Sequence, residues 1–220
     1  MSSYAERASA HRYIEAVWHK TTDGSHNWVP ADGCWDIIFA RQPDSVRVFI
    51  AGPMTKAKLT QHPVGTELFG IRFKPSIYMP QLPLSTLLDS TVDLRYGRAL
   101  SPIWLEGVRY DTPNGEAAEL FVDKLRKNTV IARDAVIDEA LDDQAIALSS
   151  RSIQRHFQQT TGLTKKFIEQ TKRVQLAEQL LKNNKPATQV ASQVGYADQA
   201  HMTRSFRMLL GYTPSQLVHT

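Results

Sequence analysis

The sequence predicts an α+β protein in which a small β-sandwich or barrel is followed by an all-α region with two helix-turn-helix units. Three observations lead to this prediction. The first half holds short apolar runs between turns rich in Gly and Pro, the apolar spacing becomes helical after residue 116, and positive charge collects near the C-terminus. A turn at residues 113–115 separates the two patterns, so the predicted domains are residues 1–115 and 116–220.

Strands are predicted in the first half because the apolar residues there occur in short runs. Residues 35–40 and 46–51 are apolar, each follows a turn containing Pro and Asp, and together they predict a hairpin. Residues 67–73 alternate, which indicates a half-buried strand. The side chains expected on its apolar face are Phe69, Ile71 and Phe73.

The first helix-turn-helix signal begins at Ser149, a good N-cap residue. Ile153 and Phe157 lie four residues apart and are expected to face inward, and Thr161-Gly162 ends the helix. The outer side carries Arg151, Gln154 and Arg155. Arg and Gln form paired hydrogen bonds with guanine and adenine in the major groove, so this combination is typical of DNA recognition.

The second signal follows a long bridging helix that ends at residues 183–186. Thr188 is expected to cap one helix, Gly195 to supply the turn, and Asp198 to cap a second helix over residues 199–210. The inner stripe of this second helix is Met202, Phe206 and Leu209. Its outer and flanking residues are Gln199, His201, Thr203, Arg204 and Arg207.

Charge is distributed unevenly along the chain. Residues 144–220 contain 10 Lys and Arg but only 3 Asp and Glu, whereas residues 1–143 contain 16 and 19. A compact basic region predicts a polyanionic partner. A solvated helical hairpin with a basic face would also explain one such unit. Two units in tandem favour DNA.

An ordered set of motifs in this half matches a known family. The motifs are residues 148–157, 161–164, Arg173 with Ala177 and Leu180-Leu181, 190–196, 198–206 and 211–214. These segments closely resemble the AraC/XylS family of bacterial transcription regulators, over roughly residues 133–217. The stretch before Ser149 departs from the family pattern, because it contains no Gly where the family turn has one.

The resemblance implies a homeodomain-like fold of seven helices and a role in transcription regulation. Both recognition helices would enter successive major grooves of double-stranded DNA. By residue match, the base contacts of the first unit would come from Arg151, Gln154 and Arg155. Those of the second unit would come from Gln199, His201, Thr203 and Arg204. Arg207 is better placed for phosphates, and Arg173 for a structural role. RNA polymerase is a further candidate partner.

Segments of the first half resemble the short, cupin-like N-terminal domain of some of these regulators. The segments are residues 30–39, 51–53 and 69–75. A sensor domain of this kind predicts a small-molecule effector, and the candidate pocket is formed by Trp35, Phe39, Phe69 and Arg72. The same aromatic side chains are equally able to fill a small core. An alternative is a regulator without an effector, whose first half forms a homodimer.

The sequence favours a protein that is not an enzyme and that holds no cofactor or metal. Nucleophile-elbow, P-loop and dinucleotide motifs are absent. His26, Asp32, Cys34, Asp36 and His62 are possible ligands, but they lack the spacing of a dedicated metal site. A cupin-like metal enzyme with a basic appendage is the remaining alternative. Since no apolar run reaches the ~18 residues of a membrane span and no secretory signal is present, we expect a cytoplasmic protein without a membrane partner.

Overall fold

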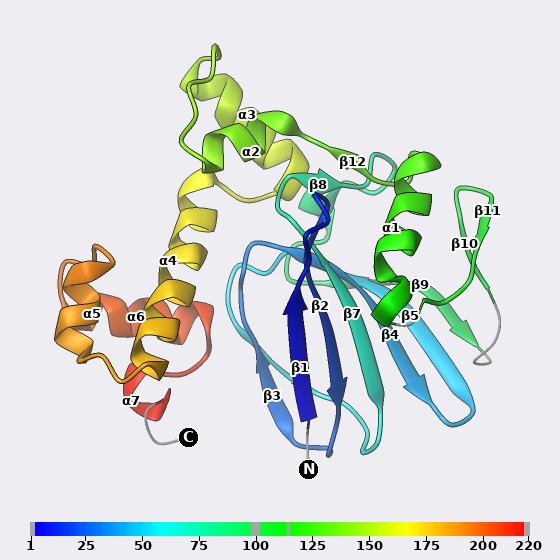
Figure 1. Ribbon diagram of the computed structural model, residues 1–220, viewed down its shortest axis with the longest axis horizontal. Coiled ribbons are helices and arrows are strands. Elements are labelled where there is room, and N and C mark those ends of the chain that lie inside the picture. The colour runs from blue at the N-terminus through cyan, green and yellow to red at the C-terminus, as the bar shows by residue number, and fades with distance from the viewer. Residues whose placement is uncertain (1–2, 98–101, 114, 218–220) are drawn as a thin grey trace.

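The computed structural model describes residues 3–97, 102–113 and 115–217. It contains a strand-rich N-terminal part followed by a helical C-terminal part, which confirms the predicted fold class (Figure 1). The described strands are β1 (Ser3–Ala8), β2 (Ile14–Thr21), β3 (His26–Val29), β4 (Trp35–Gln42), β5 (Ser45–Ala51), β6 (Lys58–Gln61), β7 (Glu67–Phe73), β8 (Ile77–Tyr78), β9 (Thr91–Gly97), β10 (Ile103–Leu105), β11 (Val108–Tyr110) and β12 (Ala132–Arg133).

Six of these strands form one antiparallel sheet in the order β1-β2-β7-β4-β5-β9. The predicted hairpin is present as β4 and β5, and the predicted third strand is β7. Three two-stranded ribbons surround the sheet: β3–β6, β10–β11 and β8–β12. The strands β1 and β2 were not predicted from the sequence. Every residue of β1 is exposed, and a register shift between Ile14 and Ala16 disturbs the alternation of β2.

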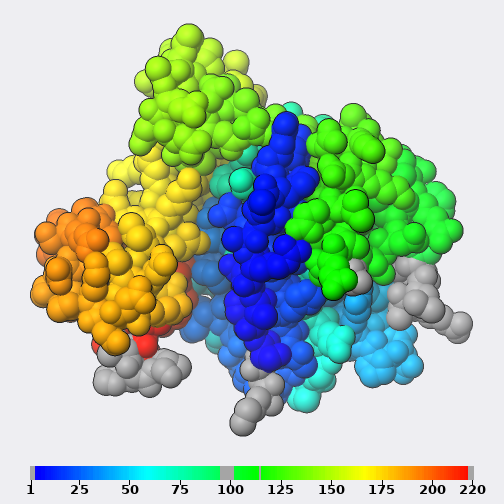
Figure 2. All heavy atoms as spheres, viewed as in Figure 1, coloured from blue at the N-terminus to red at the C-terminus, as the bar shows by residue number. Residues whose placement is uncertain are grey.

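The helices are α1 (Ala118–Lys127), α2 (Ala135–Leu141), α3 (Ser150–Thr161), α4 (Lys165–Lys182), α5 (Ala187–Gln193), α6 (Gln199–Leu209) and α7 (Pro214–Leu217), with 3-10 helices η1 (Leu84–Thr86) and η2 (Gly115–Ala117). Figure 2 shows that the residues from α2 to α7 form two lobes connected by α4. One lobe contains α2 and α3, and the other contains α5 and α6 (Figure 1).

The main core lies on one face of the sheet. Phe39, Ile71 and Phe73 of that face pack with α1, whose Phe121 forms an edge-to-face contact with Phe39 at 5.8 Å. The predicted boundary after residue 115 remains a prediction. The packing of α1 favours a later one, because the buried side of this helix belongs to the sheet's core, whereas Ile137 of α2 packs in a separate helical core.

Candidate nucleic-acid interface

The second helix-turn-helix unit is formed by α5 and α6. Gly195 adopts a φ of +77° between the two helices, a conformation that glycine reaches without a Cβ penalty. The Asp198 carboxylate accepts a hydrogen bond from the backbone N–H of His201 at 2.6 Å, which confirms the predicted cap of α6. The predicted cap of α5 is wrong. Thr188 lies inside that helix, because the helix begins directly after Pro186, whose fixed φ suits a helix start.

The two faces of α6 differ as predicted. Its inner stripe is buried in a helical core with α4 and α5. Gln199, Arg204 and Arg207 are exposed, and no ion pair to either arginine is found among the described residues. These side chains are therefore available to a partner.

Two further residues proposed for α6 are more constrained. The Thr203 hydroxyl donates to the Gln199 carbonyl at 2.9 Å, and the His201 ring packs edge-on against Tyr196, with the ring centroids 5.2 Å apart. Both side chains are half-buried. Their contribution to base contacts remains a prediction, and the geometry favours Gln199 and Arg204 as the more accessible pair.

The first unit is formed by α2 and α3. The Ser149 hydroxyl accepts from the Ser152 N–H at 3.2 Å, which confirms the predicted cap. Phe157 is fully buried, whereas Arg151, Gln154 and Arg155 are exposed. Asp134 ties the two helices together. Its carboxylate accepts from the Val136 N–H at the start of α2 and contacts His156 Nδ1 of α3 at 2.7 Å.

Residues 142–149 connect α2 to α3 and contain no glycine. Asp143 adopts a φ of +52° after α2, and its carboxylate pairs with Lys165 Nζ at 3.2 Å. Asp is one of the few residues with a Cβ that visits the left-handed region routinely. The connection from α2 to α3 is therefore made without Gly, and it is longer than a tight turn.

The bridging helix α4 joins the two units. Val174, Ala177 and Leu181 on its buried face pack in the core of the second unit. Arg173 lies over the Tyr196 ring, with its Cζ 5.8 Å from the centroid. This contact agrees with a structural role for Arg173.

The predicted effector pocket requires a correction. Trp35, Phe39 and Phe69 lie together, but they are at most 3% exposed and fill the core. Phe39 stacks on Phe69 with their ring centroids 5.4 Å apart, and Trp35 stacks on Phe73 at 4.2 Å. Arg72 is separate from them, because it alternates with Phe69 and Phe73 along β7 and so lies on the other face of the sheet.

That other face borders a cavity of about 1190 Å³, which we name the interdomain hollow. Its walls come from the sheet, from the β3–β6 ribbon, from α2 and from α4. Its lining includes Tyr4, Trp18, Ile38, Phe49 and Arg72 of the sheet, Trp28 and Leu59 of the ribbon, and Lys172, Gln175 and Glu178 of α4. The cavity is not apparent from the sequence, because its walls come from segments that are distant in the chain.

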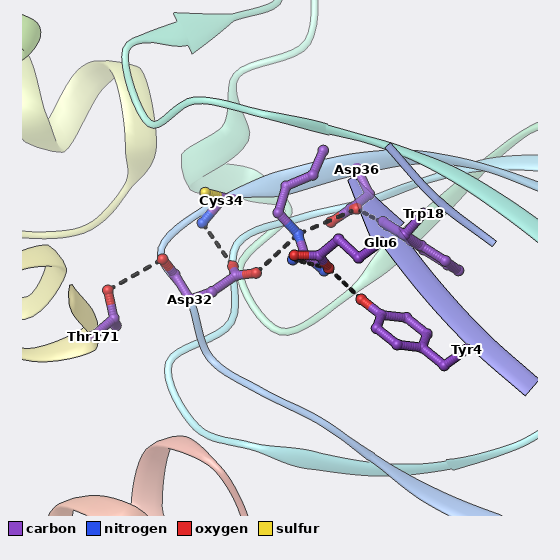
Figure 3. Close-up of polar contacts among 8 residues, drawn as sticks. Tyr4, Glu6, Trp18, Asp32, Cys34, Asp36 and Thr171 are labelled. Atoms are coloured by element: carbon purple, nitrogen blue, oxygen red, sulfur yellow. Dashed lines mark hydrogen bonds and ion pairs between the residues drawn. The ribbon is translucent and has the colours of Figure 1, made fainter. Parts of the chain in front are cut away.

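Arg72, which lines the hollow, forms ion pairs with three carboxylates, those of Glu6, Asp32 and Asp36 labelled in Figure 3. Its Nε lies 3.0 Å from Asp32 and 3.6 Å from Asp36, and its Nη1 lies 3.2 Å from Glu6. Asp36 also accepts from the Trp18 indole N–H at 2.7 Å. Burial raises the pKa of Asp36 to about 6, with the neighbouring Asp32 adding to the rise and Arg72 opposing it.

This cluster connects the sheet to the bridging helix. The Asp32 carboxylate accepts from the Cys34 N–H at 2.9 Å, and the Asp32 carbonyl accepts from the Thr171 hydroxyl of α4 at 3.1 Å (Figure 3). Cys34 is buried, and burial raises the pKa of its thiol well above the ordinary value. The thiol is therefore not activated as a nucleophile.

In residues 3–97, 102–113 and 115–217, no group of three or more His, Cys, Asp or Glu side chains is arranged to hold a metal ion. Within the same ranges, none of the helices has the length and apolar character needed to cross a membrane.

Residues 144–219 match a family model described as a helix-turn-helix domain, and residues 7–93 match one described as a domain of unknown function (DUF6597). No curated protein matches the chain by sequence.

Among solved structures, the chain is similar to crystal structures of ToxT from Vibrio cholerae. For ToxT from strain O395 the identity is 9%, the similarity covers 99% of this chain and 97% of that chain, and the TM-score is 0.44. For a second crystal form the identity is 11%, with 100% and 97% covered and a TM-score of 0.42. For wild-type ToxT of strain SCE256 bound to an unsaturated fatty acid, the identity is 11%, the coverage 92% and 93%, and the TM-score 0.42.

Proposed function

The chain carries a C-terminal helix-turn-helix domain of the AraC type, and on that premise we propose that it is a sequence-specific DNA-binding transcription regulator. One observation carries the proposal. Two helix-turn-helix units in tandem each bury one face of a recognition helix and leave Arg and Gln side chains exposed on the other. Arg and Gln are suited to guanine and adenine edges in the major groove.

The two units contact successive major grooves on one side of the duplex. Half-sites one helical turn apart, ~34 Å or about ten base pairs, match tandem recognition helices joined by a rigid connector. The helix α4 is such a connector, because its 18 residues are continuous and its buried face packs within both helical cores. The operator therefore has two short blocks.

Base and phosphate contacts are divided among the exposed residues. Arg151, Gln154 and Arg155 contact the first block, and Gln199 and Arg204 contact the second, with His201 and Thr203 in supporting positions. Arg207, nearer the end of α6, contacts a phosphate, which fixes the register of the protein but carries no sequence information.

An effector binds in the interdomain hollow rather than among the core aromatic residues. The hollow combines exposed aromatic side chains with charged groups, as small-molecule sites do. Its walls include α4, so a bound molecule touches the helix that joins the two units. The alternative is a regulator without an effector, whose N-terminal half forms a homodimer. RNA polymerase is a candidate partner in both cases.

Selection of binding sites from random duplex DNA tests the DNA-binding function. Purified protein at physiological salt should enrich a motif of two blocks about ten base pairs apart. Enrichment of one block would show that only one unit contacts bases. Binding that is salt-sensitive but enriches no motif would contradict sequence-specific recognition.

A thermal-shift screen of small molecules tests the effector. A molecule that binds only the folded chain raises the unfolding temperature with its concentration. A variant with Gln175→Trp, which fills part of the hollow, should lose that shift while unfolding at a similar temperature without the molecule. Mass in solution that rises with concentration, and no stabilising molecule, would favour the dimerising form.

A further inference from the structure

The C-terminal end of α6 is held by the N-terminal half of the chain. The backbone N–H of Ala31 donates to the Leu209 carbonyl at 2.8 Å, and that of Ala57 donates to the Met208 carbonyl, also at 2.8 Å. The last carbonyls of an α-helix have no partner within the helix. At α6 these partners come from residues more than 140 positions earlier in the sequence.

Both donors lie at the same end of the β3–β6 ribbon. Val29 pairs with Lys58 at that end, and Ala31 and Ala57 lie just beyond this pair. Ala31 is buried in the core of the second helix-turn-helix unit, where it packs with residues of α4 and α6. The ribbon thus ends directly on the second recognition helix.

A third contact fixes the segment after α6. The Trp28 ring of β3 packs so closely on Gly211 that a Cβ added to this glycine would lie 2.2 Å from a ring carbon. Gly211 also has a φ of +87°, which favours glycine. An indole ring in direct contact with backbone on one side leaves little freedom for α6 to tilt.

The first recognition helix is held differently. α3 packs against η1 and β8, and Gly162 at its end lies against Ser85. Among the described residues, no backbone hydrogen bond joins α3 to the β3–β6 ribbon. A change in the ribbon therefore acts on α6 and not directly on α3.

We propose that the β3–β6 ribbon is a positioning element for α6, and that Trp28 is its principal side chain. The N-terminal half then determines the angle of the second recognition helix and with it the contacts to the second DNA block. This inference rests on the proposed DNA-binding function.

The test uses the full chain and two duplexes, one with both selected blocks and one with the second block scrambled. Trp28→Ala should weaken binding to the intact duplex about tenfold or more, the size of losing specific base contacts. Its affinity for the scrambled duplex should equal that of the unchanged protein. Trp104→Ala is the matched control, because Trp104 is 63% exposed on β10, outside the ribbon. It should bind both duplexes normally.

A second variant tests the same contact between the ribbon and α6 without removing a large side chain. Ala57→Pro removes the N–H that donates to Met208 and should produce the same block-specific loss. An equal loss on both duplexes would indicate general unfolding and overturn the proposal. Unchanged discrimination between the duplexes in both variants would also overturn it. If the unchanged protein does not discriminate, the proposed function fails first.

Discussion

The two helix-turn-helix units join their helices by connections of different length, residues 142–149 in the first and 194–198 in the second. The shorter connection contains Gly195 at positive φ, whereas the longer one contains no glycine and has Asp143 near its start in the left-handed conformation, paired with Lys165. Both recognition helices begin at a capping side chain, Ser149 or Asp198, and both bury a phenylalanine. The motif therefore depends on its caps and inner stripe more strictly than on glycine in the turn.

The largest expected effect is the loss of the inner phenylalanines. Phe157→Ala and Phe206→Ala each remove a fully buried ring and should lower the free energy of unfolding by about 3–5 kcal/mol. Denaturant unfolding monitored by circular dichroism measures the loss. Similar values would show that the two units depend equally on their stripes. A loss below 1 kcal/mol at either site would contradict the packing described above.

Arg155→Ala and Arg204→Ala compare the two recognition faces. Each should cost about 1–3 kcal/mol of binding free energy on the selected site and relax sequence preference only in its own block. Binding titrations on duplexes with single-base changes locate the effect. Leu120→Ala is the control, because Leu120 is exposed on α1, outside both units. If Arg155→Ala leaves the first block unchanged, the Asp143 turn does not bring α3 into base contact.

The turns themselves provide a matched pair of substitutions. Gly195→Ala should destabilise the chain by about 1–2 kcal/mol, because a Cβ is unfavourable at positive φ. Asp143→Gly should be neutral or stabilise the chain by less than about 1 kcal/mol. Glycine removes the Cβ penalty at positive φ, but it also loses more conformational entropy on folding, and the two effects offset each other. Thermal unfolding of both variants checks the difference. Destabilisation by Asp143→Gly would show that the pair with Lys165 matters more than the backbone.

Arg207→Ala should have a small and uniform effect. It should weaken binding to all duplexes alike and reduce the slope of log affinity against log salt by about 1, as the loss of one phosphate contact does. Titrations at several salt concentrations measure the slope. A loss confined to the second block would instead make Arg207 a base-contacting residue like Arg204.

Asp36 lies on β4, outside both helix-turn-helix units, so a substitution there should change the pH dependence of stability without favouring either unit. Its pKa is raised to about 6 in the folded chain, so the folded state binds a proton more tightly than the unfolded state does. Stability from this residue therefore increases as pH falls from 7 toward 5. Asp36→Asn should raise the unfolding temperature at pH 7 by a few degrees and reduce this dependence, since the amide oxygen still accepts from Trp18. A steeper dependence of the unfolding temperature on pH in the variant would contradict a raised pKa of Asp36.

Much of the helical half was predictable because its signals are local. A cap and an apolar stripe with helical spacing act within one or two turns, so Ser149, Asp198 and the inner stripe of α6 are recognisable in the sequence. For the same reason, β4 and β5 follow from short apolar runs after turns, and β7 follows from alternation. The predicted cap of α5 at Thr188 was wrong, because that helix begins after Pro186, whose fixed φ suits a helix start.

The sequence by itself determined the strands β4, β5 and β7, the helices α3, α4 and α6, and which Arg and Gln side chains lie opposite the apolar stripe of α3 and α6. Only the tertiary structure decided what covers each face. Trp35, Phe39 and Phe69 share an apolar face, but sheet order and α1 make that face a core rather than a pocket. Arg72 acquires its three carboxylates, and α6 its contacts with the ribbon, because the fold joins residues that are far apart in the chain. Periodicity reports that a side chain is buried, and it does not specify the partner that buries it.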